Sequence, residues 1–530
     1  MRTFKERVSI WAAVLPAALM FGCSAAESTP EPDGLERLGT AQSEVTAQDR
    51  LAACSQDPRV TTGLLSPDIC AGGDIFLRET FAGNGRTCGS CHPIANNTTV
   101  DVPFLTALHA SNPNDPLFVF ERDPNLAQLE TGDLLGAAAV LENVDGFEDP
   151  THKFVSRSVN HMLSLRTSIL RDSGDGTGSP PVERTGWGGD GAPGDGALRS
   201  FLTGAIKQHF TKNLARREGI DFRLPSSLEL DLVNAFQLSL GRQNELDLNS
   251  VRINDADAED GRQAFMDPQR GRCNVCHSNA GANFIDTRLN RNFNTGLTRV
   301  GGNLDQGLTQ GTQNGHVFTD GGFGSTTPFD AIGIGFDNAF GDGSFSVPPL
   351  IEAADTGPFF HNNARGPDIE NAVAFYASAP FGFSPAAVAL EARFGSPLNL
   401  GAQDSFHIAR FLRVLNSAFN ADIAIQRLNA ANTLVARFGN TRADIQTKLL
   451  DLAREELNDA LSVLSFQSGL YTAAQTSIAQ ANTQIAAGIA ATTASQRQTR
   501  INAALNLVRN ARAQFGTNIN FQMGPGNLMF

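Results

Sequence analysis

The sequence predicts a mainly α-helical protein that contains two related domains and ends in a helical extension. Three observations support this prediction. The pattern Cys-x-x-Cys-His occurs twice, at Cys88–His92 and at Cys273–His277. A short amphipathic segment with a Phe residue, and then a loop with Gly and Arg, precede each copy. From Asn432 to about Phe515 the composition changes to Ala, Thr, Gln and Leu, with few helix breakers.

Each copy of the pattern is typical of a site where a c-type haem is attached covalently. Two thiols three positions apart can each bond to one vinyl group of the same porphyrin, and the adjacent histidine can bind the iron. The predicted cofactor-binding residues are Cys88, Cys91, His92, Cys273, Cys276 and His277. Of these, the two histidines are the predicted proximal iron ligands. Zinc and a redox dithiol are the alternatives, but a zinc ribbon would place its two Cys pairs only about 15–20 residues apart. We therefore expect two covalently bound haem c groups.

The two motifs also define the expected domains. The segments that precede them, Cys70–Phe81 and Asp257–Phe265, resemble the amino-terminal helix of cytochrome c domains. We therefore expect cytochrome c-like haem domains at residues 49–250 and 251–420. A helical extension is expected at residues 421–530.

Several individual helices are predicted within these domains. Ala197–His209 and Ser227–Leu240 belong to the first domain. The extension is predicted to contain two long helices, Ala443–Leu470 and Thr472–Ala513. This extension serves either for docking or homodimerisation, or as a brace on the haem domains.

The N-terminus is typical of an export signal of the lipoprotein type. Residues 1–22 have a basic start and an apolar stretch, Val8–Met20, that is too short to span a bilayer. The cleavage box would make Cys23 the lipidated first residue; an ordinary signal with an incidental Cys is the alternative. Residues 23–48 suit a flexible tether. Since Ser24 is not Asp, we expect an outer-membrane lipoprotein, in the periplasm or at the cell surface, that meets the membrane only through its lipid.

The net charge limits the partners of the protein, and the remaining cysteines suit an oxidising compartment. The net charge of −14 argues against binding to nucleic acid or to an anionic membrane surface. Cys54 and Cys70 are left over once the motifs and the lipidation site are assigned. In an oxidising compartment they are expected to form a disulfide, with two unpaired buried thiols as the alternative.

Several segments together resemble the bacterial di-haem cytochrome c peroxidase superfamily, over roughly residues 65–420. Besides both haem motifs, they are Arg157–Leu165, Gly186–Gly191, Phe345–Leu350 and Thr356–Asn362. The resemblance implies that peroxide or oxygen reacts at the first haem. The second haem then relays electrons from a small electron-donor protein or a quinol-linked donor.

Further residues take on roles through this resemblance. Trp187 matches a Trp that lies between the two porphyrins and could carry electrons; the alternative is a Trp that packs in the Gly-rich loop. The family often holds a calcium ion between its domains. Thr356 and Pro358 match its backbone-carbonyl ligands, and Asn160 matches its side-chain ligand.

The chain departs from the family at two positions. Peroxidase members carry a distal Glu as general acid and base, but the matching stretch Ala205–Phe210 has no carboxylate, so Gln208 or His209 would substitute. The Met that binds the second iron falls near Phe375, which leaves Tyr376 or His361 as the candidate distal ligand.

These departures resemble two particular relatives. A Tyr ligand resembles the relative that builds a tryptophan-derived cofactor. A His ligand without a distal Glu resembles the di-haem rubber oxygenases. The expected function is that of a peroxidase-like oxidoreductase. The alternatives are a rubber-cleaving oxygenase and a non-enzymatic electron carrier.

Overall fold

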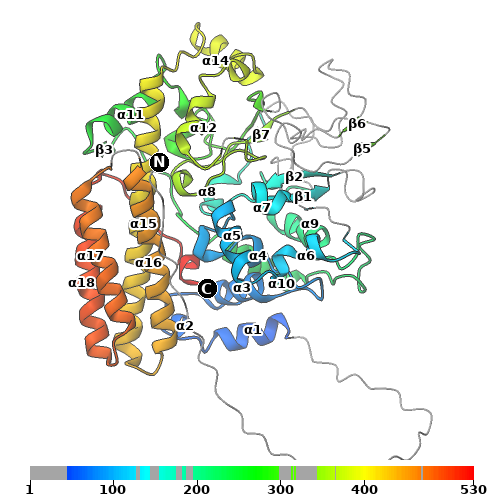
Figure 1. Ribbon diagram of the computed structural model, residues 1–530, viewed down its shortest axis with the longest axis vertical. Coiled ribbons are helices and arrows are strands. Elements are labelled where there is room, and N and C mark those ends of the chain that lie inside the picture. The colour runs from blue at the N-terminus through cyan, green and yellow to red at the C-terminus, as the bar shows by residue number, and fades with distance from the viewer. Residues whose placement is uncertain are drawn as a thin grey trace, which may run out of the picture. The chain divides into compact units, whose positions relative to one another are not determined.

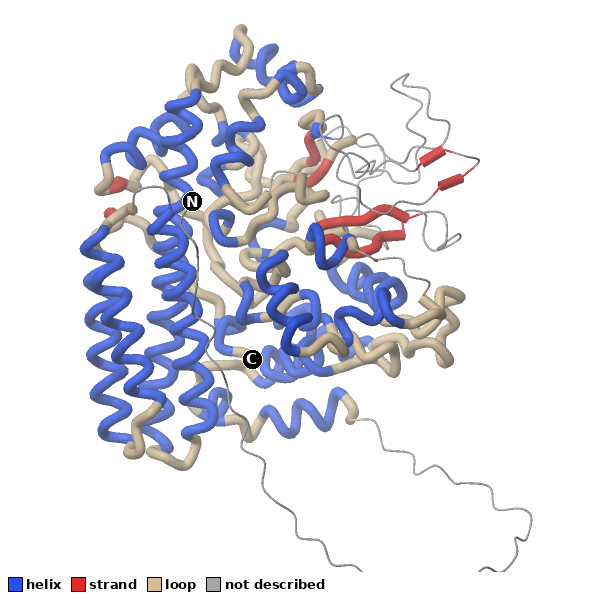
Figure 2. The backbone as a smooth tube through the Cα atoms, viewed as in Figure 1, coloured by secondary structure: helices blue, strands red, loops and turns tan. Residues whose placement is uncertain are grey.

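Helices dominate the structure, as the sequence predicts, and all strands of the described residues are short (Figure 1, Figure 2). The computed structural model describes residues 45–126, 130, 132–143, 154–174, 182–186, 195–297, 312–313, 316–317, 343–364, 366–466 and 469–530. The predicted export signal and nearly all of the tether lie outside these residues. Within the described part of the chain, no helix has the length and apolarity needed to cross a membrane.

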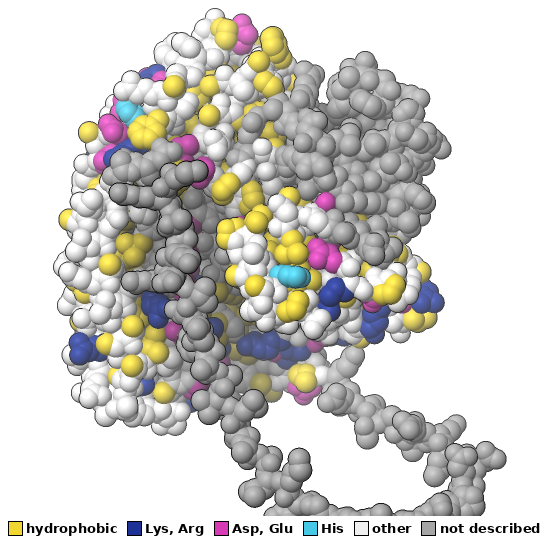
Figure 3. Space-filling model, viewed as in Figure 1, with side chains coloured by type: hydrophobic (Ala, Val, Ile, Leu, Met, Phe, Trp, Pro, Cys, Tyr) yellow, Lys and Arg dark blue, Asp and Glu magenta, His cyan; other side chains and the backbone are white. Residues whose placement is uncertain are grey.

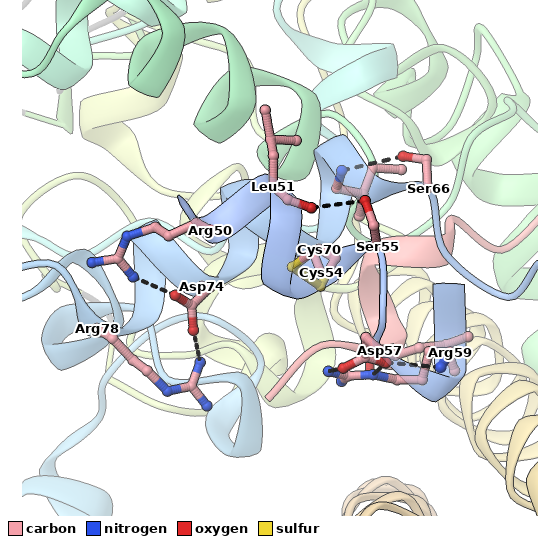
Figure 4. Close-up of a disulfide and its surroundings, with 12 residues drawn as sticks. Arg50, Leu51, Cys54, Ser55, Asp57, Arg59, Ser66, Cys70, Asp74 and Arg78 are labelled. Atoms are coloured by element: carbon pink, nitrogen blue, oxygen red, sulfur yellow. Dashed lines mark hydrogen bonds and ion pairs between the residues drawn. A yellow bond between two sulfur atoms is a disulfide. The ribbon is translucent and has the colours of Figure 1, made fainter. Parts of the chain in front are cut away.

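The first helices are α1 (Ala47–Cys54), α2 (Pro58–Thr61), α3 (Pro67–Arg78) and α4 (Cys88–Cys91). A capping box between Thr46 and Asp49 begins α1, and Ser66 with Pro67 at the first helical position begins α3. The predicted disulfide between Cys54 and Cys70 is confirmed, and it joins α1 to α3 (Figure 4).

The chain between and after the motifs alternates helices with small antiparallel strand pairs. The pairs are β1 (Ala139–Asn143) with β2 (Phe154–Ser158), β3 (Arg252–Ile253) with β8 (Gly516–Thr517), β4 (Asn292–Phe293) with β7 (Phe345–Ser346), and β5 (Thr312–Gln313) with β6 (His316–Val317). The helices are α5 (Val102–Ser111), α6 (Val119–Arg122), α7 (Asp133–Ala137), α8 (Leu165–Ser168), α9 (Leu198–His209), α10 (Ser227–Gln237), α11 (Ala256–Met266), α12 (Ile369–Phe375), α13 (Ala379–Gly382) and α14 (Pro385–Phe394). The helices predicted at 197–209 and 227–240 are thus confirmed as α9 and α10.

The helix before the first motif crosses α10 at a glycine. A Cβ atom added to Gly72 of α3 would lie 1.9 Å from the carbonyl oxygen of Leu232, so only glycine permits this close approach. One turn further along each helix, the rings of Phe76 and Phe236 pack with centroids 5.3 Å apart. Phe76 also lies beside the His92 ring, at 6.1 Å between centroids.

The helix before the second motif repeats this arrangement. It crosses α15 (Ala402–Phe438) at Gly261, where an added Cβ would lie 1.9 Å from the carbonyl oxygen of His407. Four residues on, Phe265 and Phe411 pack with ring centroids 5.7 Å apart. Glycine and Phe therefore occupy the same relative positions in both helix pairs.

The C-terminal region is a bundle of α15, α16 (Ala443–Ser465), α17 (Thr472–Ile489) and α18 (Ala494–Arg512) (Figure 1). The single helix predicted at 472–513 is wrong, because it divides after Ile489. Thr493 accepts a hydrogen bond from the Gln496 backbone N–H and begins a new helix there. The boundary expected at residue 420 lies inside α15, which runs through it without interruption.

Candidate functional site

One cavity of about 420 Å³ brings the two Cys-x-x-Cys-His motifs together. Its volume falls within the range of about 300–1,000 Å³ that is usual for small-molecule and cofactor sites. All six predicted haem-attachment residues line it: Cys88, Cys91, His92, Cys273, Cys276 and His277. Most of the wall is apolar, and α3, α9, α11, α12, α14 and α15 each contribute apolar side chains to it.

The first motif forms the short helix α4, and His92 directly follows it. The Nδ1 atom of His92 donates a hydrogen bond of 2.7 Å to the carbonyl oxygen of Thr98. Since a carbonyl can only accept, Nδ1 carries the proton and Nε2 is the ring nitrogen that can bind a metal.

The second motif has the same local geometry. His277 donates from Nδ1 to the carbonyl oxygen of Pro348 at 3.0 Å. The backbone angles also match, with φ −119° and ψ 60° at His92 and φ −111° and ψ 60° at His277. Both imidazoles are therefore oriented in the way expected of a proximal ligand, and burial lowers the pKa of His277 to about 4, which keeps that ring neutral.

The surroundings of the four motif cysteines disfavour the thiolate form. Burial raises the pKa of Cys88 to about 12 and that of Cys91 to about 11. In the second motif it raises the pKa values of Cys273 and Cys276 to about 12. None of the four forms a disulfide. All four cysteines are therefore free to form a thioether bond with a vinyl group.

A buried arginine anchors the loop that leads into each motif. Arg86 forms an ion pair of 2.6 Å with Glu130, and both side chains are fully excluded from solvent. Arg272 donates to the carbonyl oxygen of Ser396 at 2.7 Å and to its hydroxyl at 2.8 Å. These contacts fix the positions from which the cysteines reach the cavity.

Two further histidines line the cavity near the first motif. His161 and His209 each interact electrostatically with His92. Burial is the main cause that lowers the pKa of His161 to about 4 and that of His209 well below its ordinary value. Both imidazoles are thus neutral at pH 7. The Nδ1 atom of His161 is buried and has no hydrogen-bond partner among the described residues.

Gln208, the other predicted substitute for the missing Glu, lies elsewhere. Its side chain is excluded from solvent, and its amide nitrogen donates to the carbonyl oxygen of Leu141 in β1 at 3.1 Å. It is not among the residues that line the cavity. Successive residues of a helix point in different directions, so α9 presents His209 to the cavity and packs Gln208 against β1.

Both candidate distal ligands of the second haem also line the cavity. The His361 ring stacks on Phe345, with centroids 3.5 Å apart and planes 8° apart. Tyr376 ends α12 and interacts electrostatically with Cys276 and Cys273. Burial raises the pKa of Tyr376, so its side chain is a phenol at neutral pH. Tyr376 therefore lies near the second motif, and both residues remain candidates because both line the cavity.

The predicted calcium ligands Asn160, Thr356 and Pro358 line the same cavity. The Asn160 Oδ1 atom accepts from the Ser158 hydroxyl at 3.2 Å, and the Thr356 hydroxyl donates to the carbonyl oxygen of Glu352 at 3.0 Å. Within the described ranges, no group of three or more His, Cys, Asp and Glu residues could hold a metal ion. The predicted calcium ligands are backbone carbonyl groups and an amide side chain, which are not among these four residue types. The calcium site therefore stays a prediction. Trp187 lies outside the described residues.

The charges in the cavity suit the carboxylates of a porphyrin. Arg184 and Arg272 line it, whereas no Asp or Glu does so in the part of the chain that the structure describes. Two haems would bring several propionate groups into this space, and buried anions need cations or hydrogen-bond donors. The two guanidinium groups and the unpartnered Nδ1 of His161 are such groups. The donor set therefore fits haem.

Sequence reasoning did not identify the partners that orient the site. Thr98 and Pro348 act through backbone carbonyl oxygens, which no residue type reveals. Glu130 was missed because its partner Arg86 is far away in sequence. The repeated spacing of Gly and Phe in the two preceding helices was the signal that could have predicted the matching helix pairs.

None of the protein-family models compared with the chain matches it. Neither the curated proteins nor the solved structures compared with it give a match.

Proposed function

We propose that the chain is an exported di-haem c-type oxidoreductase of the cytochrome c peroxidase type. One observation carries this proposal. Both Cys-x-x-Cys-His motifs line a single cavity, and each histidine donates its Nδ1–H to a backbone carbonyl oxygen from the same backbone conformation. A zinc site would have no need for two separate, equally oriented motifs around an apolar cavity.

The repeated helix pairs support two cytochrome c-like haem domains. In each, a helix that leads into the motif crosses a partner helix at a glycine, and a Phe pair packs one turn further on. The pairs are α3 with α10, and α11 with α15. Helices α16, α17 and α18 of the bundle are additional to this repeated part.

The proposed roles follow from the positions in the cavity. Bound haem would supply a redox-active iron that reacts with peroxide or oxygen. His92 and His277 would hold the two irons, and His209 would accept or return a proton in the same cavity. His361 or Tyr376 would be a second protein ligand for the haem held by His277, and that haem would supply electron relay.

The lining also gives support to the alternative, an oxygenase of the rubber-cleaving kind. No carboxylate lines the cavity among the described residues, so the Glu that peroxidases use as general acid and base has no carboxylate counterpart there. The walls are largely apolar, which suits a hydrocarbon substrate. Analysis of products after incubation with polyisoprene distinguishes this option, because a peroxidase leaves the polymer intact.

The proposed partners are a small electron-donor protein or a quinol-linked donor, and peroxide or oxygen. The net charge of −14 suits a basic donor. On the face in Figure 3, acidic and basic side chains are interspersed with hydrophobic ones. The proposed location is the periplasm or the cell surface, with a lipid on Cys23 as the only membrane attachment.

Stopped-flow mixing with hydrogen peroxide tests the proposal. The fully reduced and half-reduced protein should show a rapid change in the visible spectrum of one haem, followed by oxidation of the other. Two low-spin haems that do not respond to peroxide in any redox state would instead identify an electron carrier.

A further inference from the structure

The loop after the first motif is held in an unusual conformation. Asn97 and Thr98 both have left-handed backbones, with φ values of 53° and 57°. Non-glycine residues adopt this conformation rarely, and a β-branched one such as Thr does so only where its surroundings enforce it. The strained segment is the one that presents the Thr98 carbonyl oxygen to Nδ1 of His92.

Contacts from two directions enforce this conformation. On one side, the Thr98 hydroxyl accepts from the Met162 backbone N–H at 2.8 Å, and the Thr99 hydroxyl donates to the carbonyl oxygen of Val159 at 2.5 Å. On the other side, the buried amide of Asn97 donates to Asp459 Oδ2 at 3.4 Å. Asp459 belongs to α16, so the C-terminal bundle reaches the loop that orients His92.

The bundle reaches the second proximal loop as well. Asp355 lies seven residues beyond Pro348, whose carbonyl oxygen accepts from His277. The carboxylate of Asp355 accepts from Asn420 at 2.6 Å, and its backbone N–H donates to Asn416 Oδ1 at 3.2 Å. Both Asn residues belong to α15.

The contact of Asp459 with the first loop and the contacts of Asp355 with α15 lie close together inside the protein. Burial, and then the nearby carboxylate of Asp355, raise the pKa of Asp459. The carboxylates of Asp355 and Asp459 are therefore close to one another. Polar side chains of α15 and α16 thus connect the loops behind both motifs.

We propose that the C-terminal bundle positions the proximal histidines, and that Asp459 is a positioning residue for His92. This inference rests on the proposed attachment of haem at both motifs. A hydrogen bond from Nδ1 to a carbonyl oxygen raises the electron density at Nε2 and so favours the oxidised iron. Loss of the Asp459 contact lets the strained loop relax and weakens that hydrogen bond.

The test compares four variants of the full-length holoprotein. Asp459→Leu removes the acceptor, and Asp459→Asn retains one. Asn97→Gly removes the donor but still permits the left-handed backbone. Asp444→Leu, in the first turn of the same helix and exposed to solvent, is the matched control. Haem content by pyridine haemochrome and circular dichroism establish that each variant is folded and loaded.

The readouts are potentiometric titration and the iron–histidine stretching band in the Raman spectrum. We expect Asp459→Leu and Asn97→Gly to move one of the two reduction steps to a more positive potential and to lower the frequency of one band. The other reduction step of these two variants should keep its wild-type potential. In Asp459→Asn and Asp444→Leu, both potentials and both bands should stay close to those of the wild type.

Two results would overturn the inference in distinguishable ways. Loaded Asp459→Leu and Asn97→Gly variants with wild-type potentials and bands would overturn the role of the bundle and leave the haem proposal intact. Wild-type protein without haem would overturn both.

Discussion

Arg86 and Glu130 form an ion pair with no exposed surface, through contacts of 2.6 Å and 3.4 Å between the guanidinium and the carboxylate. The same carboxylate accepts from the backbone N–H of Leu141 at 3.1 Å, which joins the start of the first motif to β1. The Arg86 guanidinium also lies 4.3 Å from the centroid of the Phe120 ring. This cluster fixes the loop from which Cys88 enters the cavity.

Breaking this pair should destabilise the protein strongly. Glu130→Leu leaves an uncompensated buried cation, and the expected loss of unfolding free energy is about 3–5 kcal/mol. The double variant Arg86→Met/Glu130→Leu removes both charges and should recover most of the loss. Urea denaturation measures both values. A double variant as unstable as the single one would contradict the assignment of the cost to the unpaired charge.

His209 should control the reaction with peroxide. His209→Leu removes the neutral imidazole from the cavity wall, and loss of a proton-transfer group typically slows a reaction about 10²- to 10⁴-fold. The variant Gln208→Leu serves as the comparison, because Gln208 is the other residue predicted to substitute for the missing distal Glu. Its amide bonds to Leu141 outside the cavity, so this change should cost about 1–3 kcal/mol of stability rather than rate. Stopped-flow traces in which Gln208→Leu is the slow variant would reverse these roles.

The disulfide between Cys54 and Cys70 should contribute substantially to stability. The two residues are 16 positions apart, and closing a loop of this size contributes about 3 kcal/mol. The variant Cys54→Ala/Cys70→Ala should therefore unfold at a lower urea concentration, with its haem content unchanged. Equal midpoints for the wild type in the presence and absence of a reductant would show that the disulfide does not stabilise the fold.

Asp260 should make stability depend on pH in the acid range. Hydrogen bonds from Arg270 and then from His407 lower its pKa from 3.8 to about 2, and Asp404 and Asp257 are the other acids that face this cluster. Because the folded state lowers the pKa of this acid, the stabilisation is complete above about pH 4. It is lost as the pH falls toward 2.

The matched variant for this effect is Asp260→Asn, which cannot ionise. Its melting temperature should be lower than that of the wild type at pH 6, and the difference should shrink as the pH falls from 4 toward 2. A difference that is constant over this range would show that ionisation of Asp260 does not contribute.

Much of the helical structure and the lining of the cavity could be predicted from sequence. The helices α3 and α11 follow from the amphipathic segments with a Phe that precede the motifs, and the motif residues follow from their rare pattern. The division of the predicted long helix at Thr493 was missed, because a single N-cap within an Ala- and Gln-rich stretch is a weak signal. The orientation of Gln208 away from the cavity depends on how α9 packs against β1, which spacing along the chain does not reveal.

The haem content of the protein tests the central claim most directly. Produced in a host that attaches c-type haem, the chain should give two haems per molecule by pyridine haemochrome, and an intact mass increased by two haem groups. The variant Cys88→Ser/Cys91→Ser and the variant Cys273→Ser/Cys276→Ser should each retain one haem per molecule. A mass equal to that of the polypeptide alone, with zinc in place of iron, would contradict the account.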